Sequence, residues 1–442
     1  MADLVVRGGT VVTTDRQIRA DVAIEDGRIV EVSPDLSGGR EEVDAHGLFV
    51  LPGVIDVHVH LNEPGRTEWE GGATGSRALA AGGGTVFFDM PLNSTPCTVN
   101  AREFDRKHAA LEQSSITDFA LWGGLVPRSV GEMAEMAARG VIGFKAFMSN
   151  SGLPEFPRAD DATLFEGLRE AGRLGLPVAV HAENQDLTRG FGERSTERTA
   201  RAFLDSRPVV AEVEAIQRAC LLAGEAQARL HIVHVSSGRG VAIAAEARAR
   251  GVDVSIETCP HYLYFTEEDV ERLGVVAKCA PPIRVSNEQR GLWDALMRGE
   301  VDIVASDHSP APPEMKGGDF ASAWGGIAGV QSTLAVLLER GWQERQLPLE
   351  RIAALTAAEP ARRFGIRGKG SLSPGQDADL VLIDPDATVT LKAEDLHQRH
   401  KLSPYLGATF HGSVRRTIRR GETIFVDGQI TTRSCGRLVR PG

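Results

Sequence analysis

Two histidines near the start of the chain have the spacing of metal ligands. His58 and His60 follow an apolar run at residues 48–55 and stand two positions apart. Side chains at positions i and i+2 of a strand point to the same face of a sheet. Neutral imidazole is the commonest protein ligand for zinc-like metals. The pair is therefore half of a metal site, although two partly buried, hydrogen-bonded histidines would explain an isolated pair as well.

Further residues that can bind metals stand at the ends of later apolar segments. Lys145, His181, His234 and Asp307 each lie in or directly after such a segment. One residue of this kind means little, but this whole set is hard to explain by chance. Active sites of parallel β/α barrels lie at the carboxyl ends of the strands. The pattern therefore predicts one metal site that is assembled from several strand ends.

The middle of the chain alternates short apolar segments with Ala-rich amphipathic ones, such as 130–138 and 241–249. The strand candidates are residues 54–60, 85–90, 117–122, 141–146, 177–181, 230–235, 252–257 and 302–306. Eight β/α units predict an α/β fold, a closed (β/α)8 TIM barrel.

Both ends of the chain have a β pattern instead. The Asp26-Gly27 pair between two β-rich runs is a hairpin signal, and residues 378–383 and 423–430 have similar composition. We expect the two ends to pair into one small β-sandwich domain. The predicted parts are 1–52 for its N-terminal half, 53–365 for the metal-dependent barrel and 366–442 for its C-terminal half.

Composition limits the classes of partner. A chain of 442 residues exceeds a typical single core, and its net charge of −11 argues against nucleic acid or an anionic membrane as partner. No apolar run approaches the roughly 20 residues that span a bilayer, and the N-terminus lacks a signal-peptide pattern. The five cysteines are few and widely spaced, which suits a reducing compartment. We therefore expect a cytoplasmic enzyme with a small-molecule substrate.

Lys145 is the least ordinary member of the predicted site, because a cation inside an apolar strand is costly. A structural ion pair with Asp307 is one explanation. The other is carbamylation by carbon dioxide, which would turn the amine into a carboxylate that bridges two metals. On that hypothesis the ligands are His58, His60, carboxylated Lys145 and Asp307 for one ion, and Lys145, His181 and His234 for the other.

Two divalent cations about 3.5–4 Å apart can lower the pKa of a shared water toward neutrality. Asp307 would accept the proton of that water and later pass it to the leaving nitrogen. These ligands suit zinc, manganese, cobalt and iron alike, and zinc is the working assignment.

The remaining histidines are expected to play lesser roles. His231 is three residues from His234 and should face the other side of its strand. His261 and His308 adjoin strand ends and could support the ligands from behind. Five others are expected at the surface or in packing: His46, His108, His397, His400 and His411.

Three segments resemble the cyclic amidohydrolases, the family of dihydroorotases, hydantoinases and allantoinases. They are HLNEPGRTEWEG at 60–71, DMPLNS at 89–94, and PPEMK at 312–316 with AWGGIAG at 323–329. The resemblance covers essentially the whole chain and is greatest to the allantoinase branch. It implies hydrolysis of the cyclic amide of allantoin to allantoate in purine catabolism, by a homo-oligomer that is commonly a tetramer.

The resemblance also implies substrate contacts. Asn62 stands where dihydroorotases have an arginine for the substrate carboxylate, and an amide suits a neutral ureide, although Arg66 could compensate. Asn150 stands where hydantoinases have a tyrosine, and Ser151 follows it.

Asn93 and Cys279 are further candidates for substrate contacts. For each of these residues, a role in capping or turning its loop is the alternative.

Glycines after the last predicted strand, at 325, 326 and 329, could form a mobile loop over the pocket or let backbone approach the substrate. Rival functions also remain open. They are hydantoinase or dihydroorotase specificity, a mononuclear deaminase, and a non-catalytic scaffold on the same fold.

Overall fold

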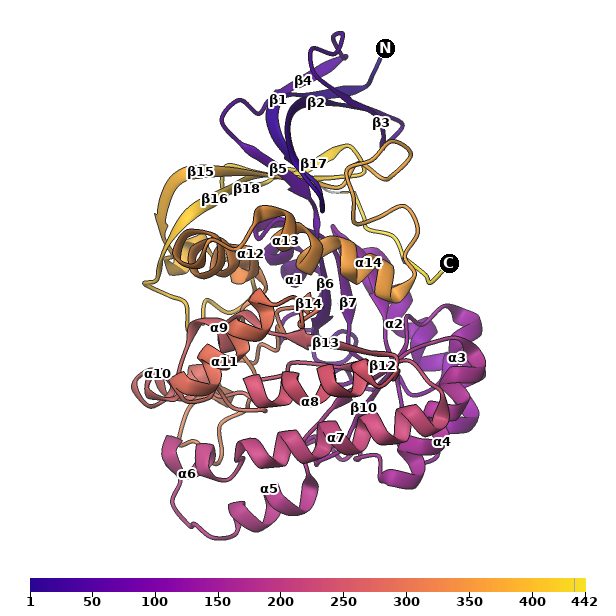
Figure 1. Ribbon diagram of the computed structural model, residues 1–442, viewed down its shortest axis with the longest axis vertical. Coiled ribbons are helices and arrows are strands. Elements are labelled where there is room, and N and C mark those ends of the chain that lie inside the picture. The colour runs from indigo at the N-terminus through magenta and orange to yellow at the C-terminus, as the bar shows by residue number, and fades with distance from the viewer. Residues whose placement is uncertain (433) are drawn as a thin grey trace.

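Strands from the two ends of the chain form one sheet. The structure, a computed structural model that describes residues 1–432 and 434–442, places these strands together at the top of Figure 1. They are β1 (Leu4–Val12), β2 (Gln17–Glu25), β3 (Arg28–Ser33), β4 (Glu41–Asp44), β5 (Phe49–Pro52), β15 (Leu380–Thr390), β16 (Thr409–Arg419), β17 (Glu422–Val426) and β18 (Gln429–Ile430). The strand order is β18-β17-β16-β15-β5-β1-β2-β3, with β4 also paired to β1.

The strand β5 joins the two halves of this sheet. It pairs in parallel with β1 and antiparallel with β15. The prediction that the two chain ends pair is confirmed. Hydrogen bonds join all nine strands into one sheet, because β5 has a partner on each side.

The middle of the chain forms strands that all run parallel. One sheet has the order β6-β7-β8 and the other β14-β13-β12-β11-β10-β9. Their bounds are β6 (Val54–Val59), β7 (Gly84–Asp89), β8 (Asp118–Leu121), β9 (Gly123–Gly124), β10 (Phe144–Phe147), β11 (Val178–His181), β12 (Leu230–Ile232), β13 (Val254–Thr258) and β14 (Ile303–Val304). Each of the eight predicted strand positions is confirmed by one of these strands.

The two parallel sheets meet at both ends. The chain passes from β8 into β9 with only Trp122 between them. On the other side, Val59 forms a parallel bridge with His308, and the backbone N–H of His60 donates to the carbonyl of His308 at 2.7 Å. The first strand of the series therefore lies beside the end of the last.

Helices separate the successive parallel strands other than β8 and β9, and Figure 1 shows α7, α8 and α4 lying along the outside of the strands. Their bounds are α1 (Gly72–Ala81), α2 (Ala101–Ser114), α3 (Met133–Arg139), α4 (Asp161–Leu174), α5 (Gln185–Gly192), α6 (Ala200–Asp205), α7 (Val209–Ala226), α8 (Gly238–Ala249), α9 (Pro260–Tyr264), α10 (Glu267–Leu273), α11 (Ser286–Met297), α12 (Thr333–Val336), α13 (Leu349–Ala353) and α14 (Glu359–Phe364).

Both faces of the parallel strands are buried, as expected for a sheet covered on each side. In β7, Val86 and Phe88 belong to one apolar cluster, together with Phe364 of α14. Phe87 points the other way and belongs to the larger cluster that includes residues of the surrounding helices. The alternation follows the two-residue period of a strand, so polar residues at strand ends stand out against an apolar interior.

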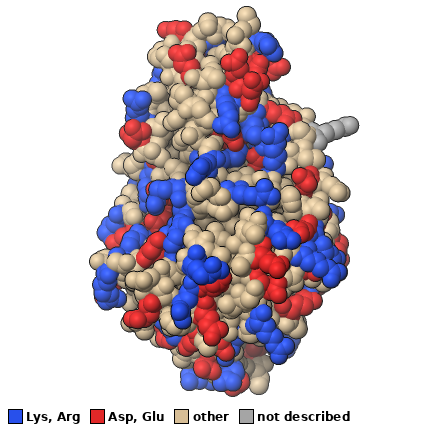
Figure 2. Space-filling model, turned by 90° about the vertical axis from the view of Figure 1, so that its right-hand side faces the viewer, with Lys and Arg blue, Asp and Glu red and all other residues tan. Residues whose placement is uncertain are grey.

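The surface carries both signs of charge. Figure 2 shows cationic and anionic side chains interspersed over the face that it displays. In the part of the chain that the structure describes, no helix is long and apolar enough to cross a membrane.

Candidate active site

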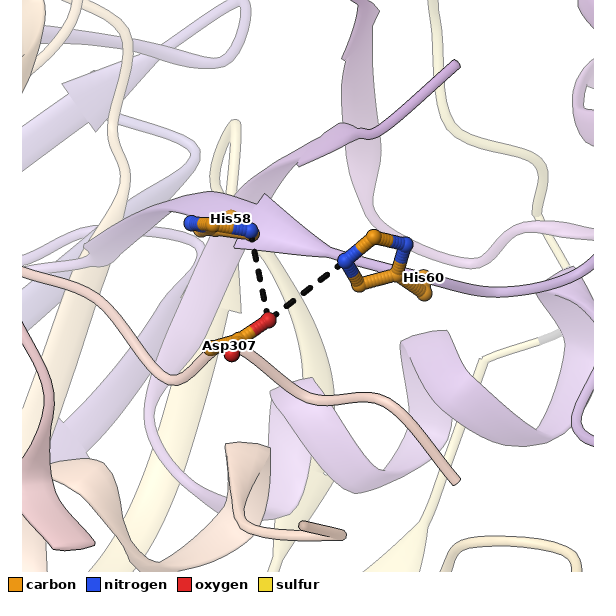
Figure 3. A group of neighbouring side chains, drawn as sticks. All are labelled: His58, His60 and Asp307. Atoms are coloured by element: carbon orange, nitrogen blue, oxygen red, sulfur yellow. Dashed lines mark ion pairs between the residues drawn. The ribbon is translucent and has the colours of Figure 1, made fainter. Parts of the chain in front are cut away.

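Three of the predicted ligands converge at the end of β6. His58 Nε2 lies 3.2 Å from Asp307 Oδ1, and His60 Nε2 lies 3.4 Å from the same oxygen (Figure 3). All three side chains are buried. Their ligand atoms lie within 4.8 Å of one another, which makes the group a candidate metal site. The period-two argument from the sequence thus correctly placed both histidines on one side of the strand.

Unusual backbone conformations accompany the site. Asp307 and His234 have φ angles of 45° and 40°, and Asn62 and Asn93 have φ angles of 65° and 71°. Few residues other than glycine adopt this left-handed region, and those that do cluster at functional sites. Left-handed backbone conformations therefore occur at several of the positions after strands where these side chains are placed.

A second pair of ligand candidates lies next to the first. His181 ends β11 and His234 follows β12. His181 Nδ1 lies 3.1 Å from His234 Nε2, and the ring centroids of His58 and His234 are 5.4 Å apart. Strand ends that are far apart in sequence thus bring four histidines together.

Lys145 lies close enough to His58, His181 and His234 to act on their charge state. Its side chain is fully buried on β10, and within residues 1–432 and 434–442 its Nζ has no hydrogen-bond partner. Burial lowers the pKa of Lys145 to about 8, although Glu257 and Asp307 favour its charged form. A buried amine without a partner is costly, and the neutral amine is the form that reacts with carbon dioxide.

The carboxylate of Glu257, on β13, accepts hydrogen bonds from three groups. Its carboxylate accepts from His58 Nδ1 at 2.8 Å, from His231 Nε2 at 2.9 Å and from the backbone N–H of His234 at 3.1 Å. Burial opposes ionisation, but His58 and His231 lower the pKa of Glu257 to about 2. Because Glu257 occupies Nδ1 of His58, Nε2 is left to face Asp307. Sequence reasoning missed this residue.

Glu183 supports the second histidine pair. Glu183 Oε2 lies 2.8 Å from His181 Nε2 and forms an ion pair with Arg207. The pKa of Glu183 is about 2, because Arg207 and His181 outweigh the effect of burial. With Nε2 engaged, His181 presents Nδ1 toward His234. No role for Glu183 or Arg207 was predicted from the sequence either.

The charge states suit metal binding. Burial lowers the pKa of His58, His181 and His234, so their rings are neutral near pH 7, which is the ligating form. Asp307 is ionised, because His58 and His60 hold the pKa of its carboxyl well below the usual range despite burial. The group therefore combines neutral nitrogens with one anionic oxygen.

A cavity of about 390 Å³ opens onto these residues. Of the five predicted substrate contacts, four line it: Asn93, Asn150, Ser151 and Cys279. Asn62 is not among the described residues that line the cavity. The Nδ2 of Asn62 is instead directed at the carbonyl of Pro310, 3.4 Å away.

Two of the lining residues also stabilise their own loop. Asn150 Oδ1 accepts from the backbone N–H of Gly152 at 3.0 Å. Ser151 Oγ donates to the carbonyl of Phe156 at 2.6 Å. The loop-capping alternative is therefore realised at both positions, which still face the cavity.

The other histidines lie as follows. His231 is buried and is not among the described residues that line the cavity. Its Nδ1 lies 2.8 Å from Ser255 Oγ, so the prediction that it packs is confirmed. His261 is buried, and burial lowers its pKa to about 4. His308 supports His60 through its backbone carbonyl. His46 and His411 pair with Asp44 and Glu339 in exposed positions.

Comparisons with known proteins show the family of the chain. The model of the amidohydrolase family matches residues 49–424. The chain is 63% identical to the allantoinase of Solibacter usitatus, over 100% of this chain and 97% of that one. It is 58% identical to the allantoinase of Rubrobacter xylanophilus, over 99% and 98%.

Among solved structures, the L-hydantoinase (dihydropyrimidinase) of Arthrobacter aurescens has a TM-score of 0.97 at 34% identity and covers 100% of both chains. The dihydropyrimidinase of Brevibacillus agri has a TM-score of 0.92 at 30% identity, over 99% and 98%.

Proposed function

The chain belongs to the amidohydrolase family, and we propose that it hydrolyses the cyclic amide bond of allantoin to give allantoate. One observation of the structure carries this proposal. Four histidines and an aspartate from four strand ends line a cavity of about 390 Å³, and the buried Lys145 of a fifth strand lies close enough to His58, His181 and His234 to act on their charge state. That volume suits a small ring compound. The full-length identity to allantoinases favours allantoin among the possible rings.

The residues present fit two divalent cations. His58, His60 and Asp307 offer three ligand atoms for one ion. His181 Nδ1 and His234 Nε2 offer two for the other. Within the described residues, Lys145 Nζ is a buried atom without a partner, and it would link the two sets once carboxylated. Such a pair of ions, when bound, supplies Lewis acidity and lowers the pKa of water.

The chain's own residues perform the proton transfers. Asp307 Oδ1 faces His58 and His60, and this ionised carboxylate is the group placed to accept a proton from the attacking water. The same carboxyl then donates that proton to the departing ring nitrogen. Because Asp307 is almost fully buried, the proton stays in the site between the two steps.

Substrate contacts come from the loops around the cavity. Asn93 and Ser309 lie side by side on its wall, with Asn93 Nδ2 3.4 Å from Ser309 Oγ. Amide and hydroxyl groups can donate to and accept from a neutral ureide. We assign these two residues, with Asn150, Ser151 and Cys279, to the binding of substrate.

We further propose that the parallel strands form one closed (β/α)8 barrel. The passage of β8 into β9 and the bridge from Val59 to His308 support closure. On this proposal residues 53–365 form the catalytic barrel domain, and 1–52 and 366–442 together form the β domain.

We also propose that the protein acts in the cytoplasm as a homotetramer. Four of its five cysteines are buried free thiols, which suits a reducing compartment. Light scattering after size exclusion tests the assembly, and a monomer would refute it.

The experiment that tests the function compares three rings. Purified protein is incubated with a divalent cation and bicarbonate, and hydrolysis of allantoin, dihydroorotate and hydantoin is measured. We expect fast turnover of allantoin alone, and its loss after chelation. Asp307→Asn keeps the shape of the side chain but removes its charge, and should abolish turnover. No turnover of any ring would refute the proposal.

Hydantoinase activity is the second candidate, because two solved structures that match over nearly the full length are an L-hydantoinase (dihydropyrimidinase) and a dihydropyrimidinase. Preferential turnover of hydantoin in the same assay would support it. The same metal site and proton transfers would then act on another ring.

A further inference from the structure

One wall of the cavity is built from residues with small side chains. Residues 321–326 line it, and all of them except Trp324 are alanine, serine or glycine. Such a wall meets a ligand mainly through its backbone. The position of the backbone, rather than the nature of the side chains, therefore decides which molecules fit.

Two lysines hold this backbone in place. Lys278 Nζ donates to the carbonyls of Phe320 and Ala323, each at 2.5 Å. Lys316 Nζ donates to the carbonyl of Trp324 at 3.0 Å and to that of Gly326 at 2.5 Å. Two ammonium groups thus hold four carbonyl oxygens between residues 320 and 326.

Backbone hydrogen bonds tie the same segments together. The N–H of Gly326 donates to the carbonyl of Lys278 at 2.7 Å, and that of Trp324 donates to Met315 at 2.8 Å. Lys316 ends the short turn η3 (Pro313–Lys316). The wall is therefore attached to two fixed points, one at residue 278 and one at residues 315–316.

The surroundings of both ammonium groups disfavour their positive charge. Lys278 is buried, with Nζ 5.1 Å from the ring centroid of Phe203, and Lys316 is partly buried. Burial lowers the pKa of each to about 8. Hydrogen bonds from a charged donor are about twice as strong as neutral ones, so these lysines can hold a loop that has little regular structure of its own.

We propose that Lys278 and Lys316 are positioning residues that fix the 320–326 wall and thereby select a ring that carries a ureido substituent over the bare ring. On this proposal the reacting amide lies at His58, His60 and Asp307, and the substituent lies against the 320–326 wall, whose residues 321–326 line the same cavity. The inference rests on the proposed function, because it takes allantoin as the substrate.

The test separates substituent binding from chemistry. Lys278→Met and Lys316→Met keep much of the apolar stem and remove the donors. We expect KM for allantoin to rise roughly 10- to 100-fold, with kcat within about threefold. The inhibition constant of hydantoin, which is the same ring without the ureido group, should change little. Lys316→Arg retains a charged donor for the carbonyl oxygens and should keep more of the affinity for allantoin than Lys316→Met does.

Lys401 provides a matched control. Its Nζ also donates to two backbone carbonyls, those of Leu396 and Gln398, but none of these residues lines the described cavity. Lys401→Met should leave KM for allantoin unchanged. Metal content and thermal unfolding are measured for every variant, so that loss of the site or of the fold is distinguished from loss of the wall.

Unchanged KM for allantoin in both methionine variants would overturn the inference. Equal shifts for allantoin and hydantoin would overturn the selective role. If a methionine variant does not fold, Lys316→Gln, which keeps a shorter neutral donor, should still raise KM, and wild-type KM in that variant would count against the inference. A wild-type protein that does not turn over allantoin would instead refute the proposed function.

Discussion

The carboxylate of Glu257 should control how tightly the site binds metal. Glu257→Gln preserves the shape of the side chain, and its oxygen can still accept from His58 Nδ1 and the N–H of His234. Its amide, however, would face His231 Nε2, which lies 2.9 Å from the present oxygen. His231 would have to change tautomer and donate through Nδ1 to Ser255. Glu257→Leu removes all three interactions.

The magnitude follows from these contacts. Loss of a group that orients a metal-binding histidine typically costs about 10- to 100-fold in metal affinity, which is about 1.4–2.8 kcal/mol. We expect Glu257→Gln near the lower value, because two of the three hydrogen bonds can persist. Glu257→Leu should reach the upper value or exceed it, since buried donors of His58 and His234 lose their acceptor.

The assay is metal binding rather than turnover. Chelator-treated protein is titrated with zinc in competition with an indicator, and bound metal is counted by mass spectrometry. Ser255→Ala is the control, because it changes only the far side of His231 and should retain wild-type affinity. Wild-type affinity in both Glu257 variants would refute the reasoning. An equal loss in Ser255→Ala would show that packing, not orientation, is responsible.

Three other perturbations have defined outcomes. Lys145→Ala should lose bound metal and at least about 10³-fold in kcat/KM for allantoin, as expected when a shared ligand is removed; full activity would exclude a bridging role. Gly326→Ala should destabilise the fold by about 1–3 kcal/mol, because the new Cβ would lie 2.3 Å from the carbonyl oxygen of Ser309. Gly325→Ala is the control, because the nearest neighbour of its Cβ would be 4.0 Å away, and its thermal unfolding should be unchanged. Asp21→Asn tests acid stability: burial opposes ionisation of Asp21, but the N–H of Gly8 and the Arg7 guanidinium lower its pKa. A lowered carboxyl pKa contributes stability above about pH 4 that is lost as the pH falls through the pKa of the folded state. The free energy of unfolding of the variant should therefore be about 1–3 kcal/mol lower than that of the wild type at pH 7 and nearly equal to it near pH 2. An equal loss at both pH values would contradict this reasoning.

The strand ends were predictable because strand periodicity is local. A histidine two residues from another on an apolar strand must share its face, and carboxyl ends of parallel strands meet. These two rules together predict that His58, His60, His181, His234 and Asp307 lie near one another. Glu257 could have been found in the same way as Lys145, since it is also a charged residue at the end of a buried apolar strand.

The cavity walls were not predictable to the same degree. Arg207, Lys278 and Trp324 lie in segments without a period, so nothing in their spacing shows which direction they face. Asn62 illustrates the same limit. The resemblance predicts a substrate contact at Asn62, where dihydroorotases have an arginine, but its backbone is left-handed and its Nδ2 faces the carbonyl of Pro310. Side-chain direction in loops depends on tertiary contacts that are remote in sequence.

The pairing of β5 on both sides has a consequence for biosynthesis. Leu51 pairs with Val381, which the ribosome adds 330 residues later. At about 5–20 residues per second, that interval is roughly 15–70 s. During it, one edge of β5 has no strand to pair with, and an unpaired edge is a template for aggregation. Fusion of the C-terminal strands ahead of residue 1, as a circular permutant, would shorten this interval and should raise the yield of folded protein.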